Sequence, residues 1–279
     1  MTTISEREQN EIDRANRSGA QPVVFVHGLW LLPDSWDNWR TLFEEQGFVT
    51  LAPGWPDDPA STADARRDPS VFAGKGITEI TDHYVDVVRA LNRKPIIIGH
   101  SFGGLITQRL AGLGLAHVAV AIDPAPFRGV LPLPLATLRS SFPVLGNPLN
   151  YSRSVALTPK QFRYAFGNAV SQEESDRLYD RYSVAGPGRP LFQAAVANFN
   201  PASAATVNTK NPQRGPLLVI SGEKDHTVPP AVAKASYKQY KKNPNETEFV
   251  EFAGRGHSLT IDNGWRDVAD AALKFIARF

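Results

Sequence analysis

The feature that most constrains this chain is a serine flanked by glycines where an apolar run meets a helical pattern. The apolar residues 96–98 lead into Gly99-His100-Ser101-Phe102-Gly103, which has the form G-x-S-x-G, and a helical pattern follows over 102–113. Such a turn holds its serine in a strained conformation, and the glycines let strand and helix approach closely. We therefore predict that the Ser101 hydroxyl projects from the sheet as a nucleophile.

Short apolar runs alternate with helical patterns along most of the chain. The predicted strands are residues 22–26, 48–52, 95–99, 117–122, 216–222 and 246–252. Strands that alternate with helices in this way form parallel sheets covered on both faces. We therefore predict an α/β fold with a mostly parallel sheet of about six strands and helices on both faces. A chain of 279 residues is long enough for one such domain with an insertion.

The alternation is interrupted between two of the predicted strands. Residues 124–214 contain no convincing buried strand, but a proline-rich apolar stretch and several helical patterns. This arrangement predicts a helical lid inserted over the strand ends. The expected organisation is a polar N-terminal arm at 1–20, a core formed by 21–123 and 215–279, and a lid at 124–214.

Composition excludes several classes of function. The formal net charge is +2 without runs of like charge, which argues against a nucleic-acid partner. The chain has no cysteine, and its scattered histidines lack metal-binding spacing, so we expect no metal and no cofactor. The N-terminus lacks the apolar region of a secretory signal, and no apolar stretch is long enough to cross a bilayer. We therefore expect a cytoplasmic protein without membrane insertion, of unknown oligomeric state.

A serine hydroxyl becomes a good nucleophile only beside a base that a third group orients. His257 lies in a glycine-rich loop after the last predicted strand, and such loops carry the ligand chemistry of open α/β sheets. Asp225 and Asp123 each follow a predicted strand and precede His257 in the chain. We predict His257 as the base and favour Asp225 as the acid, since its loop lies nearer to His257 in the inferred sheet order. Asp123 stays an alternative.

The oxyanion formed in acyl transfer needs two fixed donors. One is the backbone N–H of Phe102, and the other comes from the loop after the first strand, where we choose Leu29 over Trp30. The predicted lid is rich in apolar residues, so the acyl pocket is expected to be apolar. Trp30, Phe142 and Phe192 are candidate substrate contacts. The alternatives are that Trp30 is a core aromatic at a strand end and that the two phenylalanines hold the core of the lid itself.

These motifs, taken together, resemble the α/β-hydrolase superfamily, and within it the small bacterial serine esterases. The resemblance covers residues 23–30, 95–104, 217–229 and 250–258. It implies a triad of Ser101, Asp225 and His257, an acyl-enzyme intermediate and no cofactor. The chain departs from the family pattern at its start, because residues 1–20 do not have the pattern of the two strands that usually precede the first strand seen here.

The resemblance also indicates the reaction. Family members that act on haloalkanes and epoxides use aspartate where this chain has Ser101, so we expect acyl transfer. The predicted substrate is a small-molecule carboxylic ester with a small to medium, mainly apolar acyl group. The same triad could instead hydrolyse lactones, thioesters, amides or carbon–carbon bonds, or perform perhydrolysis. A non-catalytic small-molecule receptor is a further alternative.

Overall fold

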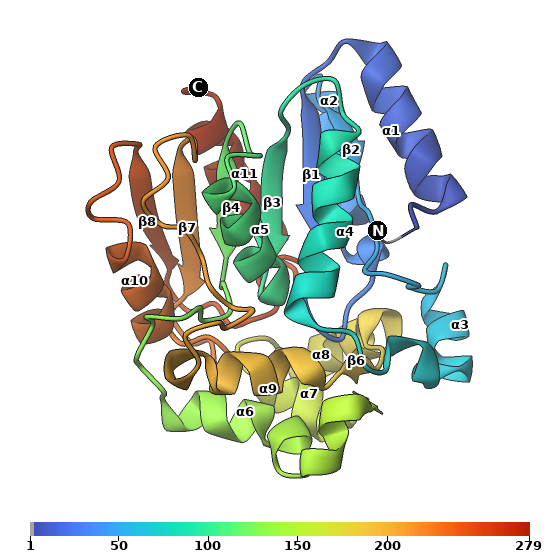
Figure 1. The fold of residues 1–279 in the computed structure, drawn as a ribbon. Helices are drawn as coiled ribbons and strands as arrows, with labels where there is room; N and C mark the ends of the chain where they lie inside the picture. The colour runs from blue at the N-terminus through green and yellow to red at the C-terminus, as the bar shows by residue number, and fades with distance from the viewer. Residues whose placement is uncertain (1–2) are drawn as a thin grey trace.

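A six-stranded parallel sheet forms the centre of the computed structural model, which describes residues 3–279 (Figure 1). The strands are β1 (Pro22–Val26), β2 (Val49–Leu51), β3 (Ile96–His100), β4 (Ala119–Ile122), β7 (Leu217–Gly222) and β8 (Thr247–Phe252). Their order is β2-β1-β3-β4-β7-β8, and every neighbouring pair is parallel. The prediction of an α/β fold with about six mostly parallel strands is confirmed.

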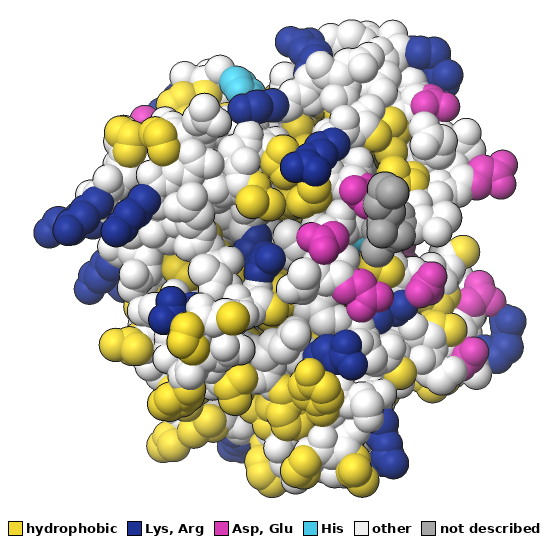
Figure 2. All heavy atoms as spheres, in the orientation of Figure 1, with side chains coloured by type: hydrophobic (Ala, Val, Ile, Leu, Met, Phe, Trp, Pro, Cys, Tyr) yellow, Lys and Arg dark blue, Asp and Glu magenta, His cyan; other side chains and the backbone are white. Residues whose placement is uncertain are grey.

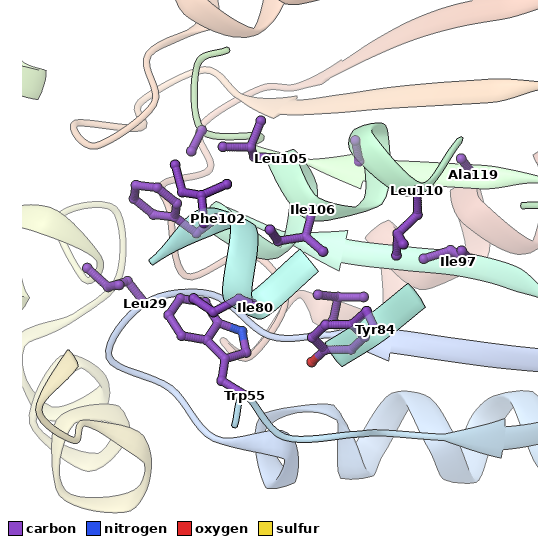
Figure 3. Packing of buried hydrophobic residues seen from close by; sticks show 14 of the residues in the cluster. Leu29, Trp55, Ile80, Tyr84, Ile97, Phe102, Leu105, Ile106, Leu110 and Ala119 are labelled. Atoms are coloured by element: carbon purple, nitrogen blue, oxygen red, sulfur yellow. The ribbon is translucent and has the colours of Figure 1, made fainter. Parts of the chain in front are cut away.

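Helices cover both faces of the sheet. The inner strands are therefore buried on both sides, which is why their residues are almost all apolar. In β1, Val23 and Phe25 pack into one hydrophobic cluster, and Val24 and Val26 pack into another on the opposite face. The cluster of Val24 faces α4 (Ile77–Arg89), α5 (Phe102–Gly112) and α10 (Pro230–Lys238), and Figure 3 shows part of it. The cluster of Phe25 faces α2 (Asp37–Glu45) and α11 (Trp265–Ile276).

The N-terminal helix α1 (Glu6–Ser18) lies along the edge strand β2 (Figure 1). Its Arg7 and Arg14 guanidinium groups donate hydrogen bonds to the carbonyls of Ala52 (2.9 Å) and Thr50 (2.6 Å). The N–H of Ala52 donates to the Glu11 carboxylate at 3.1 Å. An open sheet edge exposes unpaired backbone groups, and α1 satisfies some of those along and just after β2.

The inserted segment, residues 124–214, connects β4 to β7. Its α-helices are α6 (Leu135–Leu145), α7 (Pro159–Ala165), α8 (Gln172–Tyr182) and α9 (Arg189–Ala195). It also contains a short antiparallel pair, β5 (Ser154–Val155) with β6 (Gly186–Pro187), which is too short to leave a periodic signal in the sequence. Figure 1 shows this segment below the sheet, beyond the arrowheads of the strands.

Shorter helical elements complete the connections. They are α3 (Thr62–Arg67) and the 3-10 helices η1 (Pro33–Trp36), η2 (Pro69–Phe72), η3 (Pro148–Ser152) and η4 (Ala197–Phe199). Of the helices formed by residues 3–279, none has both the length and the apolar character that a transmembrane span requires.

Candidate active site

Ser101 occupies the sharp turn between β3 and α5. Its φ of 57° and ψ of −120° lie outside the conformations that residues other than glycine usually adopt. The close approach of strand and helix explains the flanking glycines: a Cβ on Gly99 would lie 2.2 Å from the Gly103 carbonyl oxygen. A Cβ on Gly103 would lie 2.0 Å from the carbonyl oxygen of Val26. Only glycine at both positions permits this turn, which presents Ser101 at the C-terminal edge of the sheet.

The structure brings Ser101, His257 and Asp225 into one hydrogen-bonded chain. His257 Nε2 lies 3.0 Å from Ser101 Oγ, and His257 Nδ1 lies 2.6 Å from Asp225 Oδ2. The other carboxylate oxygen of Asp225 accepts hydrogen bonds from the backbone N–H groups of Thr227 (2.6 Å) and Val228 (2.8 Å). These donors fix the carboxylate, which in turn orients the imidazole so that Nε2 can accept the serine proton.

Asp123 is the second aspartate beside His257, but it is not hydrogen-bonded to the imidazole. Its Oδ2 lies 3.9 Å from His257 Nδ1 and has no hydrogen-bond partner among residues 3–279, while its Oδ1 accepts a bond from the Gly222 N–H (2.8 Å). Burial, followed by the negative charge of Asp225, raises the pKa of Asp123 well above its usual value, which favours the neutral acid. The geometry therefore favours Asp225 as the partner of the histidine.

Two residues that our sequence analysis left without a role contact His257. His100 Nε2 lies 2.9 Å from the His257 carbonyl oxygen, and burial lowers the pKa of His100 well below its usual value. A neutral His100 that carries its proton on Nε2 donates to this carbonyl. Phe166, from the inserted segment, packs its ring edge-on against His257 with centroids 4.8 Å apart. No local sequence pattern indicates either contact, because both join distant parts of the chain.

The loop that follows β1 passes directly beside Ser101. A Cβ on Gly28 would lie 2.9 Å from Ser101 Cβ, so a side chain there would collide with the turn at Ser101. Leu29 follows in this loop and Phe102 begins α5, and the two belong to the same buried cluster (Figure 3). Phe102 directly follows Ser101 and Leu29 directly follows Gly28, so the two expected oxyanion donors belong to segments that meet at Ser101.

The three candidate substrate contacts occupy different environments. Trp30 is buried, and its indole N–H donates to the Val155 carbonyl (2.9 Å), which joins the loop after β1 to the inserted segment. Phe192 of α9 is partly buried against the main cluster and packs edge-on against Tyr151. Phe142 of α6 is 69% exposed to solvent, so the structure does not bring its ring to Ser101.

Among the described residues, one group of three side chains of the kinds that bind metal ions lies close together. The donor atoms of His100, Asp123 and His257 lie within 4.8 Å of one another, and all three residues are buried. Both ring nitrogens of His257 already bond to Ser101 and Asp225, so the group does not offer three free donors. The arrangement suits nucleophilic acyl transfer better than metal coordination.

Comparison with known proteins places the chain in a family. The sequence model of the alpha/beta hydrolase family matches residues 23–271. The chain belongs to this family. This alpha/beta hydrolase is 26% identical over 278 residues to a non-heme chloroperoxidase from Burkholderia pyrrocinia, covering 91% of the chain and 90% of that relative.

Solved structures show the same fold. A monoacylglycerol lipase from Paleococcus ferrophilus superposes with a TM-score of 0.64 at 20% identity, over 91% of this chain and 93% of that one. An extracellular alpha/beta-hydrolase from a Paenibacillus species gives 0.63 at 17% identity, over 91% and 98% of the two chains. The resemblance expected from the sequence motifs is confirmed.

Proposed function

We propose that this alpha/beta hydrolase cleaves carboxylic esters with small to medium, mainly apolar acyl groups. The observation that carries the proposal is the chain of hydrogen bonds from Ser101 Oγ through His257 to Asp225, with distances of 3.0 and 2.6 Å. Because the strained turn at Ser101 is formed by β3 and α5, the nucleophile sits on the rigid core. This combination of nucleophile, base and orienting acid is what acyl transfer requires.

The proposed reaction has two steps, acylation of Ser101 and hydrolysis of the acyl-enzyme. Ser101 Oγ attacks the ester carbonyl carbon while His257 Nε2 takes the hydroxyl proton, and Asp225 stabilises the imidazolium. The backbone N–H groups of Leu29 and Phe102 donate to the tetrahedral oxyanion. His257 then protonates the leaving alcohol, which leaves an acyl-enzyme on Ser101. Water attacks this ester with His257 again as base, and release of the acid restores the free serine.

We assign the inserted segment the role of a lid. Ser101 is only 4% exposed, and Phe166 of this segment packs against His257, so a substrate must displace part of the segment to reach the nucleophile. The Trp30–Val155 hydrogen bond joins the segment to the loop expected to form the oxyanion site. Trp30 and Phe192 remain our proposed contacts for the acyl group, whereas the exposure of Phe142 argues against that role.

The variant Ser101→Ala tests the proposed nucleophile. We expect its kcat/KM on a p-nitrophenyl ester to fall by a factor on the order of 10³ or more, because the members of a triad act as a unit. Its thermal unfolding should stay close to that of the parent protein. A serine-directed organophosphonate should add one covalent group to the parent protein, at Ser101 by peptide mass spectrometry. Near-parental ester hydrolysis by Ser101→Ala would refute the mechanism.

Perhydrolysis is a second candidate, favoured by the similarity to a protein named a non-heme chloroperoxidase. Here hydrogen peroxide instead of water attacks the acyl-enzyme, which gives a peracid and the free serine. Both reactions share the first half and need Ser101. Product analysis in the presence of peroxide separates them, since the peracid forms only if peroxide competes with water for the acyl-enzyme.

A further inference from the structure

The inserted segment carries most of the large apolar side chains that the described chain exposes. We call this set the apolar face; its members are 41–89% exposed and comprise Leu131, Leu133, Leu135, Leu138, Phe142, Leu149, Tyr151, Val196 and Phe199. Outside the segment, only Leu113 and Phe279 among the described residues are large, apolar and comparably exposed. Figure 2 shows hydrophobic side chains gathered over the end of the molecule where Figure 1 places α6 and α9. Apolar surface concentrated in this way marks an interaction site.

Helix α6 shows that this exposure is a property of the sequence pattern. Its buried positions include Ser140 and Ser141, while Leu135, Leu138 and Phe142 face solvent. A surface helix of a water-soluble protein normally buries its leucines and exposes its serines. The reversed orientation places an apolar surface on the outer side of α6.

Basic residues outnumber acidic residues in the inserted segment. Residues 124–172 contain no aspartate or glutamate, and neither do residues 181–222. The basic residues of the first stretch are Arg128, Arg139, Arg153, Lys160 and Arg163. Acidic side chains of the segment are confined to α8, at Glu173, Glu174, Asp176 and Asp180. The inserted segment thus combines exposed apolar side chains with an excess of positive charge.

We propose that the apolar face docks on an anionic lipid surface, with its leucines and phenylalanines in the interfacial layer and its arginines at the headgroups. Apolar side chains and basic residues together are what such a surface attracts. A second copy of the chain fits less well, because a symmetric contact would bring Arg128 and Arg153 of each copy to a surface of the same charge. Docking itself does not depend on ester hydrolysis. Only its consequence, delivery of lipid-borne esters to the lid, rests on the proposed function.

Vesicle co-sedimentation of the full chain tests the docking. Vesicles contain either phosphatidylcholine alone or equal parts of phosphatidylcholine and phosphatidylglycerol. We expect binding to the mixed vesicles that weakens with added salt. The double variant Leu131→Ser/Leu135→Ser should bind at least roughly tenfold more weakly, because it removes two apolar anchors. The matched control Leu113→Ser/Phe279→Ser, which changes exposed apolar residues outside the face, should bind like the parent.

Each outcome decides the proposal. Selective loss of vesicle binding in the Leu131→Ser/Leu135→Ser variant, with unchanged thermal unfolding and unchanged hydrolysis of a water-soluble ester, supports it. Absence of binding by the parent protein to either vesicle overturns it, as does equal loss in both double variants. Sedimentation equilibrium that shows a dimer abolished by Leu131→Ser/Leu135→Ser, without vesicle binding, would assign the face to a second copy instead. A parent protein that binds vesicles but cleaves no ester refutes the proposed function while docking stands.

Discussion

At the scale of single residues, the two buried aspartates beside His257 differ in their hydrogen bonds. Asp225 bonds to the imidazole and to two backbone N–H groups, whereas Asp123 bonds to the Gly222 N–H and keeps one oxygen unpartnered within the described chain. Two adjacent buried carboxylates cannot both ionise cheaply, and burial together with the negative charge of Asp225 raises the pKa of Asp123, which favours its neutral form. A protonated Asp123 carries no charge that could stabilise an imidazolium.

Substitution by asparagine separates the two aspartates. Asp225→Asn keeps the shape but removes the charge that stabilises the imidazolium, so we expect kcat/KM to fall by up to about 10⁴. Asp123→Asn replaces a neutral acid by a neutral amide that can still accept from the Gly222 N–H, so activity should stay near that of the parent. The pH at which activity declines on the acidic side should also stay unchanged in Asp123→Asn. If Asp123 were ionised, losing its charge would move that decline to lower pH, which a pH–rate profile would reveal.

The sequence indicates some of these residues and not others. Ser101 lies in a local motif, and His257 and Asp225 follow strands whose C-terminal ends meet at one sheet edge, so their proximity could be predicted. His100 and Phe166 could not be assigned, because their contacts with His257 depend on how distant loops pack. The expected role of Phe142 relied on its apolar character alone, and the structure leaves this ring in solvent.

At the scale of elements, α1 is a helix whose position in the fold the sequence does not specify. Its polar residues indicate a helix near 6–17, but they do not reveal that Arg14 bonds to the backbone of β2 and Glu11 to the backbone of Ala52 just after it. Glu8 is also buried: its carboxylate accepts hydrogen bonds from Ser5 (2.8 Å), His83 (3.0 Å) and the Gly54 N–H (3.1 Å). The charged residues of α1 suggest an arm exposed to solvent. In the structure, several of them instead hold the helix against the rest of the protein.

Glu8 predicts a pH-dependent part of the stability. Burial opposes ionisation, but the hydrogen bonds from His83 and Ser5 outweigh it and lower the pKa of Glu8 below its usual 4.5. The unfolded chain therefore takes up a proton at higher pH than the folded one, so this stabilisation is complete above 4.5 and declines as pH falls through the lowered value. Glu8→Gln should lose about 1–3 kcal/mol at neutral pH and less in acid.

Thermal unfolding across pH measures this difference. Glu6→Gln provides the matched control, because Glu6 lies in the same first turn but is exposed. It should lose only the interaction with the helix dipole, roughly 0.5 kcal/mol. A stability gap between parent and Glu8→Gln that stays constant from neutral to acidic pH would contradict the role assigned to the Glu8 carboxylate.

At the scale of the whole molecule, the sequence predicts the sheet better than the inserted segment. The strands are buried on both faces, so their apolar runs are unambiguous. In the segment, the apolar content predicted an apolar acyl pocket, but α6 directs leucines outward and serines inward. The spacing of apolar residues and the composition of α6 do not show which side of the helix faces the protein. That depends on what contacts the outer side of the helix, which the sequence does not specify.

The inserted segment and the core share one hydrophobic cluster, so we expect them to unfold together. Phe162, Phe166 and Leu178 of the segment pack in the same cluster as strand residues Val24 and Val219. Loss of the segment would expose these partners to water and destabilise the core. All five tryptophans lie outside the segment, at positions 30, 36, 39, 55 and 265. Trp30 also contacts Val155 and Phe166 of the segment, so a Trp30→Phe variant is used, in which the other four report on the core. Tryptic cleavage within 124–214, measured by pulse proteolysis along the same denaturant series, reports on the segment. The two transitions should coincide; cleavage at denaturant concentrations well below the fluorescence midpoint would show that the segment is a separately unfolding unit.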